Sequence, residues 1–450
     1  MTTPDRAPTA RAPECGLDCG LDEVVELCRD LIRIDTSNHF DGSGPGERGA
    51  AEYVAARLDE VGVDSTLFES APRRASVVAR IPGRDTSRPA LLLHGHLDVV
   101  PADRRAWTVD PFAGEIRDGC LWGRGAVDMK NMIAMMLAAV RRLARSGELP
   151  ARDVVLAFLA DEEAGGVLGS RWLAERHREL LADCDQAVSE IGGFSVQWPG
   201  PSGPRRAYLV ETARKGVAWL RLRAHGTSGH ASMTAQDNPV VRLGAALARL
   251  GEYDWPLALT ATTARTAGEL RRLTGVDIRV DPLEGTPLAP VTGLVTSSLR
   301  HVANPTVVRA GDTVNVIPAE AEALVDGRFV PGHDAEFLRT VAALVGPGIE
   351  IEVVDRTPSA EADPNSALID AMRRALWAED PSGAVVPYCS SASTDNASFA
   401  PLGIAGFGFV PLRLPAGFDF ARMFHGTDER IPLDSLRFGA RTLHRFLLDH

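Results

Sequence analysis

The sequence predicts an α/β fold in which a mostly parallel-sheet domain is interrupted by a smaller inserted α+β domain. The chain has 450 residues, more than a single hydrophobic core usually accommodates. Strand-like runs alternate with amphipathic helices over the first 190 residues, and the same pattern returns only near the C-terminus. We therefore expect one domain to be split in sequence by another.

The alternation is clearest between residues 50 and 190. Short apolar runs at residues 76–81, 90–94, 154–159 and 187–190 are typical of buried strands, and helical spacing predicts helices at 50–61 and 129–143. Strands that alternate with helices favour a largely parallel sheet that is covered on both faces.

The middle of the chain has a different pattern. A Pro- and Gly-rich loop at residues 199–204 precedes a strand pattern at 219–225, a helix at 239–250 and strands near Val314 and Leu324. A helix at 367–378 and a Gly-rich apolar run at 404–410 then restore the first pattern. We predict a larger domain over residues 21–211 and 357–450, an inserted domain over 212–356, and a disordered tail over 1–20.

The composition argues against several classes of protein. The formal net charge is −12, and no Lys/Arg cluster supplies the footprint that nucleic-acid binding needs, so we expect no nucleic-acid partner. We find no signal sequence and no run of about 18 apolar residues, and therefore expect no membrane association and a cytoplasmic location. The six cysteines are scattered, which favours free thiols over a disulfide framework.

The strongest local signal is the segment LLLHGHLDVVP, in which an apolar strand runs into His96 and Asp98. Ligand sites form at the carboxyl ends of strands in open parallel sheets. A histidine there can bind a metal while a nearby carboxylate accepts its other ring N–H. Taken alone, a buried histidine that only makes hydrogen bonds explains the pattern equally well.

Two further segments carry carboxylates. Asp128 follows the glycines of LWGRGAVDMK and precedes a Met-rich helix. A phosphate-binding loop is the alternative interpretation, but the spacing lacks the Gly-x4-Gly-Lys-Ser/Thr pattern. A later strand ends in Asp161, Glu162 and Glu163, which repel one another unless a cation or a proton relieves them. A solvated acidic loop is the competing interpretation of that segment.

Two more segments complete a possible metal site. Glu190 ends the strand-like run AVSEIGG, and His425 lies in the distal segment MFHGTDERIP. Each is uninformative alone. Together the five segments supply histidines and carboxylates at strand ends or loops of the larger domain, a set of nitrogen and oxygen ligands that suits zinc.

The motifs HGHLDVVP, GRGAVDMK, DEEAGG, SEIGG and FHGTDERIP occur in this order within residues 21–448. They resemble the dinuclear zinc family of acetylornithine deacetylase, succinyl-diaminopimelate desuccinylase, aminoacylase and the glutamate- and yeast-type carboxypeptidases. The resemblance implies a zinc-peptidase catalytic domain with an inserted lid and dimerisation domain. It also implies two Zn²⁺ ions, with Co²⁺ or Mn²⁺ as possible substitutes. His96 and Glu190 would hold one ion, Glu163 and His425 the other, and Asp128 would bridge them.

The resemblance implies roles for further residues. Asp98 would orient His96, and Glu162 would be the general base that acts on a zinc-bridging water, with a cis peptide bond after Asp128. In the inserted domain, His230 would stabilise the oxyanion, often from a partner subunit, and Asn315 and Arg328 would bind a substrate carboxylate. An ordinary surface histidine and a structural arginine are the alternatives for His230 and Arg328. Relatives also have a Thr-Asp pair where this chain has Thr394 and Asp395, to which we assign no role.

We expect a metal-dependent hydrolase that cleaves an amide bond next to a free carboxylate, in a dipeptide, a peptide C-terminus or an N-acyl amino acid. Glu190 is followed by Ile-Gly-Gly rather than by the Pro of desuccinylase-like relatives, which favours a peptidase or an N-acyl-amino-acid hydrolase. The alternatives are a deacylase dedicated to one small biosynthetic metabolite, a single-zinc enzyme, and a metal-binding or regulatory protein without turnover. The expected partners are a small-molecule or short-peptide substrate with a free carboxylate and a second copy in a possible homodimer.

Overall fold

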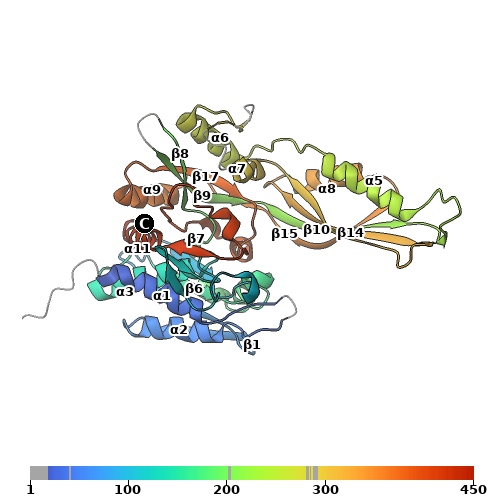
Figure 1. The fold of residues 1–450 in the computed structure, drawn as a ribbon. Coiled ribbons are helices and arrows are strands. Elements are labelled where there is room, and N and C mark those ends of the chain that lie inside the picture. Colours follow the sequence, from blue (N-terminus) through green and yellow to red (C-terminus); the bar gives the residue numbers. More distant parts are fainter. Residues whose placement is uncertain (1–18, 40–41, 201–203, 280–282, 284, 287–291) are drawn as a thin grey trace, which may run out of the picture.

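The computed structural model describes residues 19–39, 42–200, 204–279, 283, 285–286 and 292–450. Residues 1–18 of the tail predicted as disordered lie outside this range, and the prediction is wrong for its last two residues, which begin a helix at Cys19. The chain forms a large domain with a long, narrow extension on one side (Figure 1). In the described part of the chain, no helix is long and apolar enough to cross a membrane.

A ten-stranded sheet forms the centre of the large domain, with the strand order β1-β2-β6-β3-β7-β18-β9-β16, and both β8 and β17 also pair with β9. Its central strands β6, β3, β7 and β18 are parallel, whereas the outer pairs include antiparallel ones. This confirms the predicted mostly parallel α/β core. The strands are β1 (Ser65–Ala71), β2 (Arg74–Ile81), β3 (Ala90–His96), β6 (Val154–Leu159), β7 (Cys184–Ser189), β8 (Phe194–Trp198), β9 (Arg205–Arg214), β16 (Ala360–Glu361), β17 (Ala384–Ser390) and β18 (Ala405–Gly408).

Side chains of the central strands alternate between two hydrophobic cores. In β6, Val154, Leu156 and Phe158 join the larger core, and the intervening residues join the smaller one. This is the period of two that a strand buried on both faces requires. The larger core is closed by α1 (Cys19–Arg33), α2 (Arg48–Asp59), α3 (Lys130–Ser146), α9 (Ala367–Glu379) and α11 (Leu433–Asp449), and the smaller one by α4 (Ser170–Arg176) and α10 (Asn396–Phe399).

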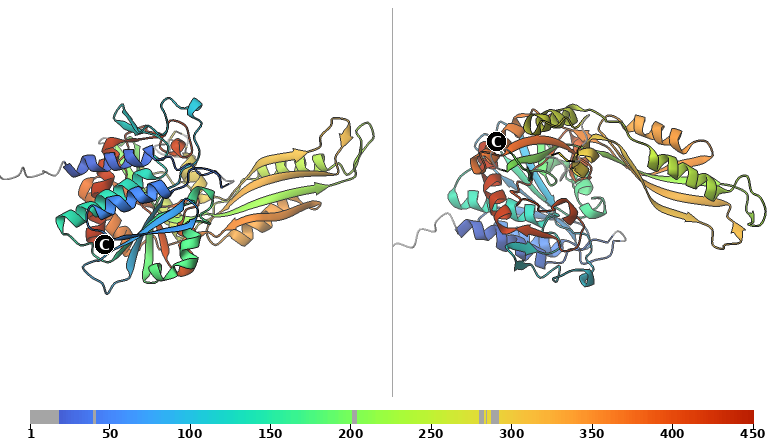
Figure 2. Two further views of the ribbon diagram at one scale, coloured as in Figure 1. Left: turned by 90° about the horizontal axis from the view of Figure 1, so that it is seen from below. Right: turned by 45° about the horizontal axis from the view of Figure 1, so that its top comes forward.

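The extension is an antiparallel sheet with the order β12-β14-β10-β15. We call this unit the lid. Its strands are β10 (Gly216–His225), β12 (Val302–Ala310), β14 (Glu320–Phe329) and β15 (Ile349–Thr357), and α5 (Pro239–Glu252) and α8 (Asp334–Val345) pack on it. Figure 2 shows both helices lying along the lid sheet. Only Lys215 separates β9 of the large sheet from β10 of the lid sheet.

Part of the predicted insertion does not pack with the lid. Helices α6 (Ala261–Thr274) and α7 (Thr292–Leu299) contact β17 of the large sheet, and Ala267 and Leu270 of α6 join the larger core. The chain therefore returns to the large domain midway through residues 212–356. A strand was also expected near Val314, and the short strand β13 (Val316–Ile317) begins two residues after it. Val314 itself is fully exposed.

Two small sheets complete the fold. β19 (Arg430–Pro432), β5 (Cys120–Trp122) and β4 (Glu115–Arg117) form one, and β11 (Gly229–His230) pairs with β13 in the other. Short 3-10 helices occur at Arg104–Ala106, Glu162–Ala164, Arg178–Leu181, Ala400–Leu402 and Ala421–Met423. Four of the cysteines, Cys28, Cys120, Cys184 and Cys389, are free thiols.

Candidate metal centre

Three of the predicted ligand segments meet at one edge of the large sheet. His96 is the last residue of β3, Glu162 and Glu163 follow β6, and Glu190 follows β7. These strands are parallel neighbours, so their carboxyl ends lie at the same edge. Asp128 joins them from the loop before α3, and His425 from the loop before β19.

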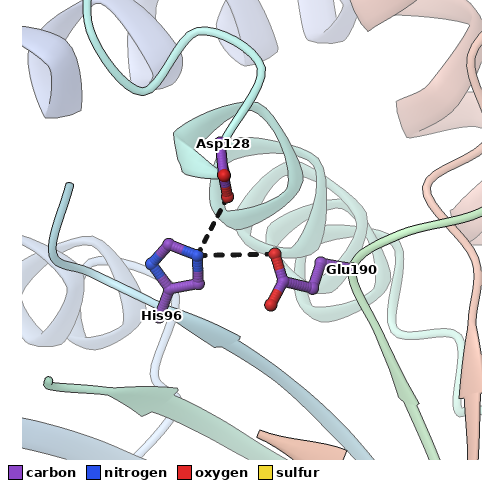
Figure 3. A group of neighbouring side chains, drawn as sticks. All are labelled: His96, Asp128 and Glu190. Carbon is purple, nitrogen blue, oxygen red and sulfur yellow. Dashed lines mark hydrogen bonds and ion pairs between the residues drawn. The ribbon is translucent and has the colours of Figure 1, made fainter. Parts of the chain in front are cut away.

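The first group of possible ligands is buried. The Nε2 atom of His96 lies 3.1 Å from Oδ1 of Asp128 and 3.4 Å from Oε2 of Glu190. Figure 3 shows the imidazole directed at both carboxylates, which come from separate elements. One nitrogen and two oxygens converging on a point is a donor set that zinc accepts.

The second group shares Asp128 with the first. The Nε2 atom of His425 lies 3.3 Å from Oδ2 of Asp128 and 3.1 Å from Oε2 of Glu163. The two oxygens of Asp128 thus point to different histidines. Within each group, the possible ligand atoms lie within 4.8 Å of one another, which is compatible with two ions bridged by Asp128.

The electrostatics of the cluster also fit bound cations. Burial raises the pKa of Glu190 to about 8, and burial together with Asp128 raises the pKa of Glu163. Oε1 of Glu163 is buried without a hydrogen-bond partner among the described residues. Crowded carboxylates with a spare oxygen need positive charge to stay ionised, so these residues fit divalent metal ions.

Asp98 and Glu162 lie immediately behind and beside His96. Nδ1 of His96 bonds to the backbone oxygen of Asp98 at 2.9 Å and lies 3.4 Å from its carboxylate. The same carboxylate accepts the backbone N–H groups of Glu162 and Glu163, both at 3.1 Å. Oε2 of Glu162 lies 4.0 Å from Nε2 of His96. Asp98 therefore connects a histidine of one strand end to the acidic turn of the next.

The loop that presents Asp128 is held by Glu429, a residue not singled out from the sequence. Glu429 is fully buried, and its Oε1 accepts the backbone N–H groups of Val127 and Asp128 at 2.5 and 2.9 Å. Its Oε2 accepts from Gly125 and from Arg124, both at 2.9 Å. The only sequence signal was its position four residues after His425 in the same motif. The peptide bond between Asp128 and Met129 is cis, as expected.

The predicted residues of the lid lie at different ends of it. Arg328 pairs with Val217, the second residue of β10, so it lies at the end nearest the large domain. Its guanidinium binds Asp326 at 2.7 and 2.9 Å and points Nη1 at the backbone oxygen of Ser391, 3.4 Å away. His230 pairs with Val316 beyond the far end of β10. Of the predicted lid residues, only Arg328 lies at the end of the lid sheet that joins the large domain.

His230 and Asn315 lie together but away from the metal ligands of their own chain. The backbone N–H of Ala231 donates to the backbone oxygen of Asn315, and both side chains belong to exposed residues. β10 has 10 residues, which at 3.3 Å each span about 30 Å between the large domain and this end of the lid. Within one chain, the structure does not bring these two residues to the candidate site.

Thr394 and Asp395 lie in the loop after β17. Thr394 Oγ1 and Asp395 Oδ2 are buried without hydrogen-bond partners among the described residues. Burial raises the pKa of Asp395 to about 7, and its charge contributes to the raised pKa of Glu162 and Glu190. Asp395 therefore belongs to the acidic surroundings of the site.

The model of the peptidase family M20/M25/M40 matches residues 92–449. The chain belongs to this family. Aminoacylase-1 of Sus scrofa is 28% identical over 423 residues, covering 90% of both chains. Succinyl-diaminopimelate desuccinylase of Gluconacetobacter diazotrophicus is 29% identical and covers 92% of this chain and 93% of its own. The M20 metallo-carboxypeptidase Sso-CP2 of Sulfolobus solfataricus superposes with a TM-score of 0.71 at 20% identity, over 95% of this chain and 99% of that one.

These matches confirm the family that the five motifs suggested. The chain is an M20 family hydrolase, and this family is metal-dependent. Its mostly parallel catalytic sheet and second sheet domain match the fold of the solved M20 enzyme. The substrate, the metal and the roles of individual residues belong to the proposal that follows.

Proposed function

We propose that this protein hydrolyses an amide bond next to a free carboxylate, in a dipeptide, a peptide C-terminus or an N-acyl amino acid. The observation that carries the proposal is the pair of ligand groups that share Asp128, with Glu162 beside His96. A cluster with two metal positions and one further carboxylate is suited to hydrolysis.

His96 and Glu190 would hold one divalent ion, Glu163 and His425 the other, and Asp128 would bridge them. The donors are imidazole nitrogens and carboxylate oxygens, which favour zinc and also accept cobalt or manganese. When bound, the two ions lower the pKa of a shared water and polarise the amide carbonyl.

Glu162 is the proposed general base. Burial and the neighbouring Glu190 raise the pKa of Glu162 well above its usual range, so its carboxylate is a better proton acceptor than an exposed glutamate. It would take a proton from the attacking water at Oε2 and pass it to the amine that leaves. Asp98 acts indirectly, because its backbone oxygen and carboxylate keep His96 in the orientation that directs Nε2 into the site.

Recognition of the substrate carboxylate is assigned to the lid. Arg328 offers a planar guanidinium suited to carboxylates, and its Nη1 faces the loop that carries Thr394 and Asp395. Asp326 holds its other two nitrogens. This pairing fixes the arginine in place, and the second N–H of Nη1, beside the one that donates to the backbone oxygen of Ser391, is proposed to bind the ligand.

Asn315 and His230 would serve the site of a partner subunit. About 30 Å of lid separates them from the large domain of their own chain, and this supports assigning them to the site of a second copy. The far part of the lid exposes Met233, Val240, Val241, Val308 and Val316, and exposed apolar clusters mark protein interfaces. We propose a homodimer through the lid, in which His230 donates to the oxyanion of the partner's substrate and Asn315 binds its carboxylate.

The test is a substrate panel with protein loaded with zinc, cobalt or manganese. N-acetyl amino acids, dipeptides and succinylated amino acids are compared by kcat/KM. Glu162→Gln should keep both ions and lose about 10²- to 10⁴-fold in kcat, the usual contribution of general-base catalysis. Glu175→Gln, an exposed glutamate of α4, is the control. Near-normal turnover by Glu162→Gln contradicts the role of Glu162.

Two other functions give different results in the same panel. A deacylase dedicated to one small acylated metabolite would cleave a single compound and leave dipeptides intact, and the 29% identity to a desuccinylase keeps this candidate in the comparison. A binding protein without turnover would hold metal and cleave nothing. One metal ion per chain instead of two would indicate a single-zinc enzyme.

A further inference from the structure

A small cavity borders the candidate metal centre. Its volume is about 10 Å³, and its walls include Glu190 and the apolar side chains of Val127, Ile191, Phe194, Val410, Phe420 and Phe424. We call it the Phe pocket. Three aromatic rings form one side, with ring centroids 5.0 Å apart between Phe194 and Phe420 and 5.2 Å apart between Phe420 and Phe424.

The Phe pocket touches the metal ligands through their sequence neighbours. Val127 and Met129 flank Asp128, Ile191 follows Glu190, and Phe424 precedes His425. Four walls of the pocket are therefore placed by the same backbone that places the ligands. The pocket therefore adjoins the segments that carry the possible metal ligands.

The turn after Glu190 shapes one wall. Ile191 has a φ of 61°, and Gly192 and Gly193 also have positive φ. Gly192 cannot carry a side chain, because a Cβ atom there would lie 2.4 Å from the backbone oxygen of Gly408. A β-branched residue with positive φ is rare, and here it brings an aliphatic side chain to the edge of the pocket.

The described lining residues of the Phe pocket include no lysine, arginine or histidine. Glu190 is the only ionisable residue among them, and its carboxylate faces Nε2 of His96 at 3.4 Å. A carboxylate placed in the pocket would lose its water and gain no basic or polar side-chain donor from the described lining residues, which is unfavourable. An aliphatic or aromatic group would lose nothing and bury apolar surface.

We propose that the Phe pocket is the specificity subsite of this enzyme and that it takes an uncharged apolar group of the substrate. The inference rests on the proposed amide hydrolysis and narrows its substrate class. The apolar group is the acyl chain or the amino-acid side chain on one side of the scissile bond. The small volume means that the pocket as it stands accepts about one methyl-sized group, and longer groups require Phe420 to move.

The experiment uses two substrate series with the zinc-loaded full chain. The first varies the acyl group on methionine through acetyl, butyryl, hexanoyl and succinyl. The second varies the amino acid of N-acetyl compounds through alanine, leucine, aspartate and lysine. We expect kcat/KM at least 100-fold higher for apolar than for charged groups in one series, which identifies the group that occupies the pocket.

The variant Phe420→Ala enlarges the pocket, and Phe420→Leu is the milder second variant. In the series that responds, the preference should shift toward the longer group by about tenfold or more, as expected for added methylenes in an apolar pocket. Phe337→Leu changes a buried phenylalanine of the lid core and should leave the preference unchanged. Thermal unfolding of all variants shows whether each is folded.

The outcomes separate this inference from the proposed function. Equal kcat/KM values for apolar and charged groups in both series overturn the pocket assignment but leave the proposed hydrolysis intact. An unchanged preference in folded Phe420→Leu has the same meaning. If no amide is cleaved, hydrolysis fails and the same compounds are tested for binding by calorimetry. Tighter binding of apolar members, with the preference moved toward longer groups by Phe420→Ala, then supports the pocket, and equal binding of apolar and charged members overturns it.

Discussion

Glu429→Gln is expected to loosen the metal centre although Glu429 is not a proposed ligand. Its two oxygens together accept three backbone N–H groups and one guanidinium N–H. Glutamine has the same shape but replaces one oxygen with a donor. Whichever way the amide turns, two of these four donors lose their acceptor.

The magnitude follows from the bonds that are lost. A hydrogen bond to a charged group contributes about 1.5–3 kcal/mol, so two of them correspond to about 3–6 kcal/mol of unfolding free energy. Three of the four donors are backbone N–H groups of the loop that presents Asp128, those of Gly125, Val127 and Asp128. In either orientation of the amide, at least one of them loses its acceptor, so the support of the loop is weakened. Residues that orient ligands typically contribute 10- to 100-fold to metal affinity, and we expect a loss of this size for both ions.

The assay combines denaturant unfolding of the metal-free protein with zinc titration against a chelator. Glu379→Gln is the matched control, because Glu379 is also mostly buried and accepts from Arg441 and Arg445, both at 2.7 Å. The control should lose stability and keep its metal affinity. If Glu429→Gln binds zinc at both metal positions with wild-type affinity, Glu429 does not support the loop that presents Asp128.

Three further predictions concern the turn after Glu190, the lid and the interface. Gly192→Ala should lower the unfolding free energy by about 1–3 kcal/mol or more, because the added Cβ would meet backbone atoms. The control Gly268→Ala in α6, where nothing lies within 4 Å of the added Cβ, should leave the unfolding free energy unchanged or raise it by up to about 1 kcal/mol. Equal effects of the two substitutions contradict the packing argument. Burial, His333 and Lys215 lower the pKa of His301 to about 4. As the pH falls below about 6.5, this histidine is therefore protonated in the unfolded chain before it is protonated in the folded one. Its contribution lowers the unfolding free energy by about 1.4 kcal/mol per pH unit down to pH 4. His301→Gln should remove only this contribution from the slope of stability against pH in denaturant unfolding, because His94, His444 and His450 also have lowered pKa values. An unchanged slope contradicts the contribution of His301. Val241→Glu on the exposed face of α5 should give monomers in sedimentation analysis. The control Val167→Glu changes an exposed valine of the large domain and should leave the dimer intact. A wild-type protein that is monomeric contradicts the proposed lid dimer.

The sequence by itself determined the family, the mostly parallel core and the set of side chains gathered at its edge. His96 and Glu190 each stand at or next to the end of an apolar run. This pattern is local, since alternating burial defines the strand and the polar residue after it marks the carboxyl end. Parallel neighbours then bring those ends together, so a motif along the chain becomes a cluster in space.

Only the tertiary structure decided features that depend on residues far apart in the chain. Glu429 holds the Asp128 loop across about 300 positions, α6 packs on β17 rather than on the lid, and the walls of the Phe pocket come from residues between Val127 and Phe424. No local periodicity encodes such contacts, because they arise from the packing of complete elements. The lid gives another example. The sequence predicted Arg328, His230 and Asn315 as residues of one site, but strand pairing puts the arginine at one end of the lid and His230 and Asn315 at the other.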